Sequence, residues 1–285
     1  MSNPPSRLNK ALRVQLNASL NPMIVDVLST LDLARPWWDP LKNWLPGGER
    51  WQQALPMSAC GLDASATTVA DLLNALAPAA CPVRFVPQSA LPAGVAYEQF
   101  IGQTGLCPTR DNEHDFFNGL CWFRFPEVKS VFNRIQSQQI ARQGVGQRRG
   151  IIRDTITLLD EGGLFLLAPP PLWEAIAERD WQRAFVHERT LWAQAHVAPI
   201  GHALLEKCAR PYKALTANVI RVPEGTGADE VDHVMAQVLA DMLSPGQLQA
   251  KPHCPLPVMG IPGWDPANED PVFYEDARVF SPPRR

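Results

Sequence analysis

Proline is the residue that most constrains what this chain can fold into. The 285 residues include 28 prolines, which are spread over much of the sequence. Proline has no backbone N–H and its ring clashes with the preceding helical turn, so long uninterrupted helices and central strands are disfavoured where it occurs. We therefore expect many short elements joined by ordered turns. Since 46% of the residues are apolar, the chain can also bury a substantial core, which excludes general disorder.

The charge balance and the cysteines exclude several classes of protein. The formal net charge is -3 and the isoelectric point is near 6.1, so nucleic acid or an anionic membrane would have to bind a local basic patch. Six cysteines at irregular spacings predict free thiols in a reducing compartment. We expect no signal peptide, because the basic residues near the N-terminus are not followed by an uninterrupted apolar region or a cleavage-like site. We expect no membrane span, because Pro169–Pro171 interrupt the apolar run from Gly162 to Leu172. These features predict a cytoplasmic protein.

Apolar residues at three- and four-residue spacing predict several helices. Thr68 and Asp71 form a capping-box pattern before one of them, and Pro126 ends one helix at Phe125 and starts the next. The expected helical segments are 8–31, 69–77, 113–125, 126–143, 172–194, 200–208 and 229–243.

Strands are expected at 83–87 and 214–222, and a short one at 272–274 in a proline-rich C-terminal segment. Residues 97–101 and 106–110 suggest a loose hairpin or a strand and turn. The β-branched and apolar runs 155–159 and 164–168 flank Asp160-Glu161-Gly162-Gly163 and predict a second hairpin. Because helices and strands interleave without a regular βαβ alternation, we expect an N-terminal helical segment, 1–34, and one helix-rich α+β domain, 35–285, with short hairpins.

A tryptophan-rich segment follows the first predicted helix. Trp37, Trp38, Trp44 and Trp51 lie among prolines, and such a cluster either stacks sugars or bases or packs between elements. We interpret it as packing.

The first candidate site is a polar group within an aromatic-rich helix. His114, Asp115 and Asn118 lie three or four residues apart, so their side chains share adjoining parts of one helix face. A buried polar group without a hydrogen-bond partner costs roughly 2–7 kcal/mol, so these residues must find partners. Two interpretations remain open: the partners are a ligand or metal, or His114 and Asp115 cap the helix and Asn118 binds a loop.

Two further pairs are candidates. Arg153 at the entrance of the predicted hairpin is suited to clamp an anionic substrate, and Asp154 to act as base or metal ligand, although a solvated salt bridge explains them equally. His202 and Glu206, four residues apart, form either a metal-binding pair or an ordinary helical hydrogen bond. The HExxH pattern of zinc proteases is absent, as are P-loop, nucleophile-elbow and dinucleotide-binding motifs.

A basic stretch runs from Arg124 to Arg153 and suggests a phosphate-binding surface. Its basic residues are Arg124, Lys129, Arg134, Arg142, Arg148, Arg149 and Arg153, opposed by Glu127 alone. Acidic residues at 265–276 offer an alternative, in which the C-terminal segment docks on this basic helix.

Several short residue groups occur in a fixed order along the chain: Tyr97-Glu98, Pro108-Thr109-Arg110, His114-Asp115-x-x-Asn118 with Trp122 and Phe125-Pro126, Arg153-Asp154, Leu159-Asp160-Glu161, Gly201-His202-Ala203 with Glu206, Pro262-Gly263-Trp264 and Phe273-Tyr274. Over about residues 35–280, this order resembles a bacterial family of unknown function, DUF3025. The resemblance implies a single cytoplasmic module and carries no activity, so no catalytic residue follows from it.

The residues support three functional hypotheses. In the first, a small-molecule enzyme performs acid–base or metal-assisted hydrolysis with His114, Asp115, Asn118 and Asp154 as catalytic residues. Candidate substrate-binding residues are then Arg110, Arg153 and Trp122, and His202 and Glu206 are candidate metal ligands. In the second, a non-catalytic module uses residues 124–153 to bind nucleic acid or an acidic partner. The third is a structural scaffold, and no cofactor is specified by the sequence.

Overall fold

The computed structural model describes residues 28, 30–50, 68–143, 150–244, 246–247 and 252–282. The helix expected over 8–31 therefore lies almost wholly outside the described residues, as does Trp51. Among the helices that are described, none combines the length and apolar character needed to cross a membrane.

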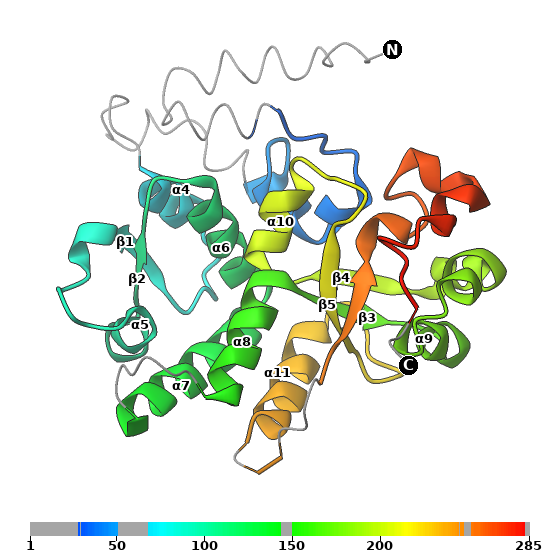
Figure 1. The fold of residues 1–285 in the computed structure, drawn as a ribbon. Helices are drawn as coiled ribbons and strands as arrows, with labels where there is room; N and C mark the ends of the chain where they lie inside the picture. The colour runs from blue at the N-terminus through cyan, green and yellow to red at the C-terminus, as the bar shows by residue number, and fades with distance from the viewer. Residues whose placement is uncertain are drawn as a thin grey trace. The chain divides into compact units, whose positions relative to one another are not determined.

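The described elements confirm an α+β fold made of short segments (Figure 1). The helices are η1 Pro36–Trp44, α4 Val69–Leu76, η3 Gln88–Ala90, α5 Tyr97–Thr104, α6 Glu113–Arg124, α7 Pro126–Gln143, α8 Ile151–Gly162, α9 Pro170–Ala177, the π-helical turn η4 Arg183–His187, η5 Arg189–Gln194, α10 His202–Cys208, α11 Val231–Met242, η6 Val258–Gly260, η7 Pro266–Glu269 and η8 Pro271–Glu275. The strands are β1 Arg84–Pro87, β2 Leu106–Thr109, β3 Gly163–Leu167, β4 His196–Pro199, β5 Thr216–Arg221 and β6 Cys254–Pro257.

The contacts divide the chain into two compact units. Unit 1 contains the described residues up to Ala34 and from Trp38 to Pro126. Unit 2 contains Arg35–Trp37 and the described residues from Glu127 onward. The domain boundary expected near residue 35 stays a prediction.

Unit 1 is built around the parallel pair β1 and β2. The predicted capping box is present at the start of α4, where the Thr68 side chain accepts a hydrogen bond from Asp71 N. Asn74 ties α4 to β1, because its side chain donates to Phe85 O and accepts from Phe85 N, at 2.8 and 3.0 Å. Gly119 of α6 packs against Leu73 of α4 so closely that a Cβ atom would lie 2.4 Å from the leucine methyl groups. Unit 1 therefore has a tight helix–strand core.

Unit 2 is built around a mixed four-stranded sheet with the order β4-β3-β5-β6. Strand β3 pairs antiparallel with β4 and parallel with β5, and β5 pairs antiparallel with β6. Helix α8 contacts β3 and β5, α9 contacts β6, and the two helices lie on opposite sides of the sheet (Figure 1). The central strand β3 reads Gly-Leu-Phe-Leu-Leu, and its first four residues are buried, as expected for a strand covered on both faces.

The tryptophan-rich segment packs into the cores, as predicted. In unit 1, Trp38 stacks on Phe117 with ring centroids 5.7 Å apart. In unit 2, Trp37 lies 5.3 Å from Trp264. Trp37 and Trp38 are both buried, so neither offers a stacking platform.

The two predicted hairpins are wrong. Residues 155–159 belong to helix α8, which continues to Gly162 and leads without a loop into β3, so no turn separates two strands there. Residues 97–101 likewise belong to helix α5, which Gly105 ends in a left-handed conformation with φ of 68°. In α8, burial of the face that contains Thr155, Ile156 and Leu159 outweighed the β propensity of the individual residues.

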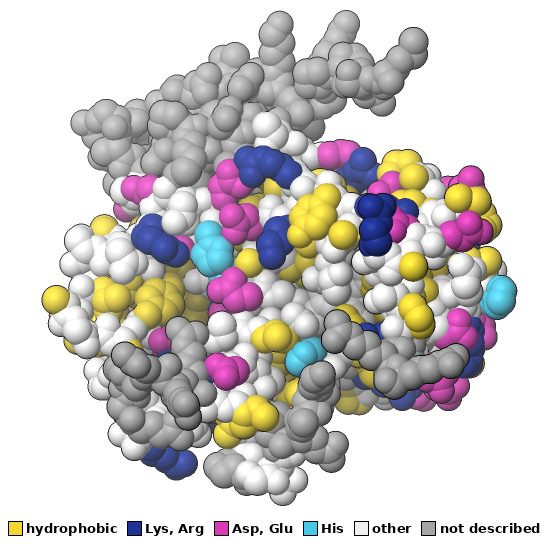
Figure 2. All heavy atoms as spheres, in the orientation of Figure 1, with side chains coloured by type: hydrophobic (Ala, Val, Ile, Leu, Met, Phe, Trp, Pro, Cys, Tyr) yellow, Lys and Arg dark blue, Asp and Glu magenta, His cyan; other side chains and the backbone are white. Residues whose placement is uncertain are grey.

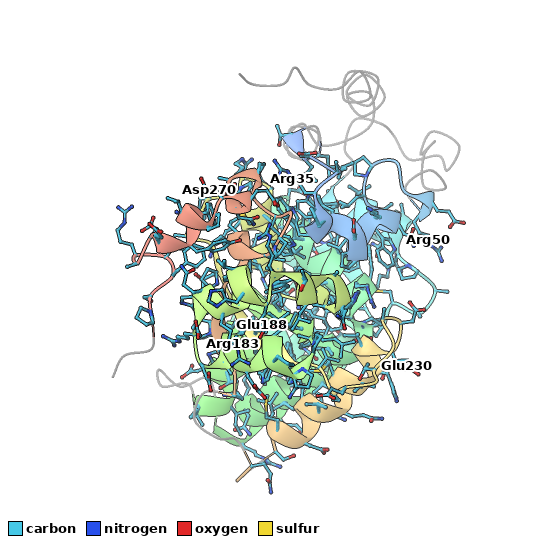
Figure 3. The ribbon with its side chains drawn as sticks, turned by 90° about the vertical axis from the view of Figure 1, so that its right-hand side faces the viewer. Arg35, Arg50, Arg183, Glu188, Glu230 and Asp270 are labelled. Carbon is cyan, nitrogen blue, oxygen red and sulfur yellow. The ribbon has the colours of Figure 1, made fainter. Side chains whose placement is uncertain are left out.

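The long helix predicted over 172–194 is interrupted. Helix α9 ends at Ala177, and Arg179 has a φ of 56°, a left-handed conformation that ends a helix. The chain continues as η4 and η5, where Arg183 and Glu188 lie side by side (Figure 3) and form an ion pair of 3.6 Å. The strand predicted at 272–274 is also wrong, since these residues belong to the 3-10 helix η8.

The start of helix α7 supplies a stability prediction. Asp232 of α11 is buried and accepts hydrogen bonds of 3.0 Å from the backbone N–H groups of Glu127 and Val128. In Asp232→Ala these buried donors lose their acceptor, so we expect unfolding free energy to fall by about 3 kcal/mol in chemical denaturation. The control is His233→Ala, whose exposed pair with Glu127 contributes less than about 1 kcal/mol. Equal losses in both variants would contradict this role of Asp232.

Candidate functional site

The candidate site lies where the end of α8 meets the start of α10, and two glycines make this approach possible. Gly163 O accepts hydrogen bonds from Ile200 N and Gly201 N, at 3.1 and 2.9 Å. A Cβ atom on Gly201 would lie 2.6 Å from both Glu161 O and Gly163 N. Because such distances are below any ordinary contact with a Cβ atom, only glycine lets the two backbones pack this closely. His202, the next residue, is thereby held beside the last turn of α8.

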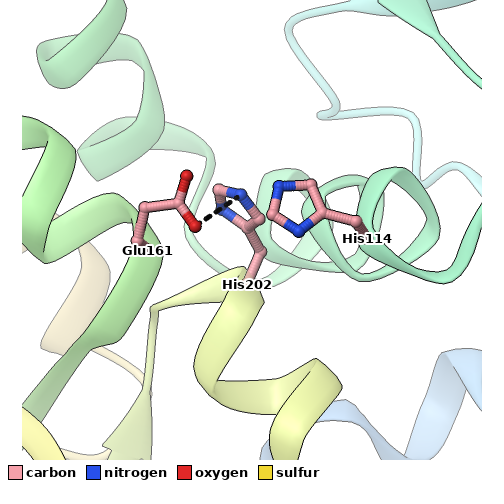
Figure 4. A group of neighbouring side chains, drawn as sticks. All are labelled: His114, Glu161 and His202. Atoms are coloured by element: carbon pink, nitrogen blue, oxygen red, sulfur yellow. Dashed lines mark ion pairs between the residues drawn. The ribbon is translucent and has the colours of Figure 1, made fainter.

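His202 lies between two consecutive carboxylates of α8. Its Nδ1 is 3.7 Å from Asp160 Oδ2, and its Nε2 is 3.7 Å from Glu161 Oε2 (Figure 4). These distances are those of ion pairs, since a hydrogen bond between nitrogen and oxygen is about 2.7–3.2 Å long. The imidazole is 5% exposed, whereas the Glu161 side chain is 46% exposed. Of the two residues, Glu161 is therefore the one that a molecule in solution can reach.

Asp160 has a second, buried partner. Its Oδ1 forms an ion pair with Nζ of Lys129, a residue of α7 whose side chain is 5% exposed. The ammonium group balances the charge of Asp160 inside unit 2, which reduces the cost of keeping this carboxylate beside His202. A series of ionisable side chains thus runs from buried Lys129 through Asp160 and His202 to Glu161.

A pocket of about 340 Å³ lies next to these side chains, and Glu161 is the member of the series that lines it. Its lining combines groups that bind polar ligands with three leucines. The lining residues are Asp154, Thr157, Leu158, Glu161, Gly162, Ala203, Leu204, Lys207, Leu215, Thr216 and Asn218. Such a mixture of apolar walls and a few polar groups is typical of small-molecule sites.

Two cysteines of unit 2 are unsuited to nucleophilic chemistry. Burial raises the pKa of the Cys208 thiol on α10 to about 12 and that of Cys254 to about 11. Since the thiolate is the reactive form, both thiols are inert at neutral pH. The five cysteines within the described residues are free, as predicted, while Cys60 lies outside them.

A family model for proteins of unknown function, DUF3025, matches residues 83–284, well over half of the chain. The chain belongs to this family. The resemblance drawn from the sequence is thereby confirmed. Comparison with curated proteins and with solved structures gives no match.

In this DUF3025 chain the predicted residues of α6 are held by specific contacts within unit 1. Asn112, not His114 or Asp115, caps the helix by accepting a hydrogen bond from Asp115 N. The Asp115 carboxylate accepts from the backbone and guanidinium of Arg110, and this bond raises the pKa of Arg110. Asn118 donates to the Tyr97 hydroxyl at 3.4 Å. Asp115 and Arg110 thus bind each other across the loop that leads into α6.

The remaining predicted residues divide between the units. His114, in the first turn of α6, and Trp122, which is buried, belong to unit 1. Arg153 and Asp154 stand in the first turn of α8 rather than at a hairpin entrance, and Asp154 lines the pocket. Because the units are described separately, the expected meeting of His114 with Asp154 and His202 stays a prediction. The metal-binding pair of His202 and Glu206 on α10 also stays a prediction.

The basic stretch is dispersed over different environments. Lys129 and Arg153 are buried, and the Arg124 guanidinium lies 5.0 Å from the Phe125 ring centre. Of the basic residues described in this stretch, Arg134 and Arg142 are the exposed ones. Figure 2 shows acidic and basic side chains interspersed on the visible face.

The C-terminal acidic residues have other partners than this stretch. Glu269 pairs with Arg189 at 2.7 Å, and Asp276 pairs with Lys213 at 3.5 Å. For these two residues the predicted docking on the basic helix is therefore wrong. The hypothesis of a nucleic-acid or acidic partner stays a prediction.

Three residues of the pocket lining were missed by the sequence analysis: Lys207, Thr216 and Asn218. Lys129 was noticed, but as a member of the basic stretch. Asp160 and Glu161 were noticed, but as the tip of a hairpin. A signal was present, because Ile152, Thr155, Ile156 and Leu159 follow helical spacing and would place Asp160 and Glu161 on the last turn of a helix.

Proposed function

We propose that this protein is a small-molecule enzyme that performs acid–base hydrolysis at Glu161 and His202. The observation that carries the proposal is the buried imidazole of His202, held 3.7 Å from each of two carboxylates, one of which, Glu161, lines the pocket. Consecutive carboxylates on both sides of one imidazole are costly to assemble and contribute little to packing. Such arrangements of titratable groups cluster at functional sites.

Each residue has a distinct role in this proposal. Glu161, which is reachable from the pocket, takes a proton from an attacking water molecule. His202 donates a proton to the leaving group, and Asp160 orients the imidazole through Nδ1. Lys129 is a positioning residue, because it fixes and neutralises Asp160. Lys207 and Asn218 bind polar groups of the substrate, as members of the pocket lining.

A divalent metal ion would use the same residues in a different way. Around a tetrahedral zinc ion, ligand atoms at bond lengths of about 2.1 Å lie roughly 3.4 Å apart. The 3.7 Å between His202 Nε2 and Glu161 Oε2 is close to that separation. These two atoms therefore fit as partners of one metal ion, which would supply an activated water molecule.

The test combines a substrate screen with a metal titration on the full-length protein. Chromogenic carboxylic esters, phosphoesters and amides are incubated with metal-free protein and with protein supplied with Co²⁺. We expect turnover of one substrate class, and its loss in His202→Asn. A visible Co²⁺ spectrum that disappears in His202→Asn assigns the metal-assisted form, and the same titration of His114→Ala tests whether His114 contributes.

Glu178→Gln is the control, because Glu178 is an exposed glutamate 3.8 Å from Arg183. Turnover that is unchanged in His202→Asn contradicts the proposal. So does a protein that neither hydrolyses any substrate class nor binds Co²⁺.

A further inference from the structure

Arg153 is a buried cation without an ion-pair or hydrogen-bond partner among the described residues. Arg153 is 7% exposed, and its buried Nε–H group has no hydrogen-bond acceptor. A guanidinium group stays charged in proteins, and burying a charge without a partner is strongly unfavourable. The position therefore calls for an anion that the described part of the chain does not provide.

The position of Arg153 in the helix indicates where that anion binds. Arg153 is the third residue of α8, a twelve-residue helix. Its N-cap residue is Gly150, which has no side chain that could accept a hydrogen bond from the first turn. The first backbone N–H groups of a helix have no acceptor within the helix, and the helix dipole makes this end positive. Helical side chains lean toward the N-terminus, which directs Arg153 to the same end.

Among the described residues, the carboxylate nearest to Arg153 in the sequence lies on another face of α8. One carboxylate, Asp154, belongs to the first turn, and it lines the pocket that also contains Lys207. Adjacent helical residues point about 100° apart, so Asp154 and Arg153 lie on different faces of α8.

We propose that the N-terminal turn of α8 binds the phosphate group of a small phosphorylated molecule, with Arg153 as its charged partner. Backbone N–H groups at a helix start together with a forked guanidinium are suited to a tetrahedral oxyanion. Arg153 and Glu161 are eight residues apart on α8, about 12 Å along the helix axis. This phosphate site is therefore separate from the proposed hydrolytic site, and each can fail without the other.

The test measures thermal unfolding of the full chain in inorganic phosphate and in chloride at equal ionic strength. We expect phosphate to raise the Tm of wild type along a saturable curve. In Arg153→Met the phosphate effect should vanish, while the Tm in chloride should be no lower than that of wild type, because an unpaired buried charge has been removed. Arg142→Met, which removes an exposed arginine of α7, should respond to phosphate as wild type does.

A second variant and a direct measurement protect the test against misfolding. Arg153→Lys keeps the charge but loses the fork, so we expect phosphate binding by isothermal titration calorimetry to weaken about tenfold. Equal stabilisation of wild type, Arg142→Met and Arg153→Met by phosphate overturns the proposal. So does a phosphate response of wild type no larger than that in chloride.

Discussion

Glu161→Gln is expected to lower kcat for the substrate found in the screen by a factor of about 10² to 10⁴, the usual contribution of a general acid or base. Glutamine keeps the size of the side chain and its place in the pocket lining but cannot accept a proton at neutral pH. Because Glu161 is half exposed, the free energy of unfolding should change little. Steady-state kinetics and chemical denaturation of the purified variant measure the two quantities.

The structure also predicts how kcat and KM divide between neighbouring residues. Asn218→Ala removes a pocket-lining amide that takes no part in proton transfer, so it should raise KM more than it lowers kcat. A Glu161→Gln variant that retains wild-type kcat would remove Glu161 from the reaction. Loss of kcat accompanied by an equally large loss of stability would assign it a structural role instead.

Gly201→Ala is expected to lower the free energy of unfolding by about 3 kcal/mol, the upper part of the usual range for overpacking. The added Cβ atom would meet three backbone atoms at 2.6–2.7 Å: the O and C of Glu161 and the N of Gly163. Backbone cannot rotate away as a side chain does, so α8 and α10 must separate. The variant should therefore lose turnover together with stability, although residue 201 provides no functional group.

Gly162→Ala is the matched control, because its Cβ atom would meet only the side-chain amide of Asn218, at 3.1 Å. We expect it to lose less than about 1 kcal/mol when both alanine variants are unfolded in urea, since the end of a side chain can move. If both alanine variants lose the same stability, the close approach at Gly201 is not what holds the site together.

The sequence alone predicted those elements that carry local boundary signals. Thr68 and Asp71 marked the start of α4, Pro126 separated α6 from α7, and the helical spacing near Val231 predicted α11. These signals act within a few residues of the boundary they set, so no knowledge of the tertiary structure was needed. The family resemblance, the α+β class and the packing of Trp37 and Trp38 were also predicted from the sequence alone.

The sequence did not predict elements whose conformation depends on distant partners. Residues 155–159 contain β-branched side chains, yet they form a helix because one face of α8 packs on β3 and β5. Strands β4 and β6 are short and contain proline, and each forms by pairing with a strand far away in the sequence. Propensity is a weak guide where long-range burial decides between helix and strand.

What the sequence determined by itself was the set of chemical groups and the short segments that carry them, because caps, prolines and apolar spacing act locally. Only the tertiary structure decided that the last turn of α8 meets the start of α10, since that approach depends on Gly163 and Gly201 packing backbone against backbone. The pairing of His202 with Asp160 and Glu161, some forty residues away, follows from this contact and from no local pattern.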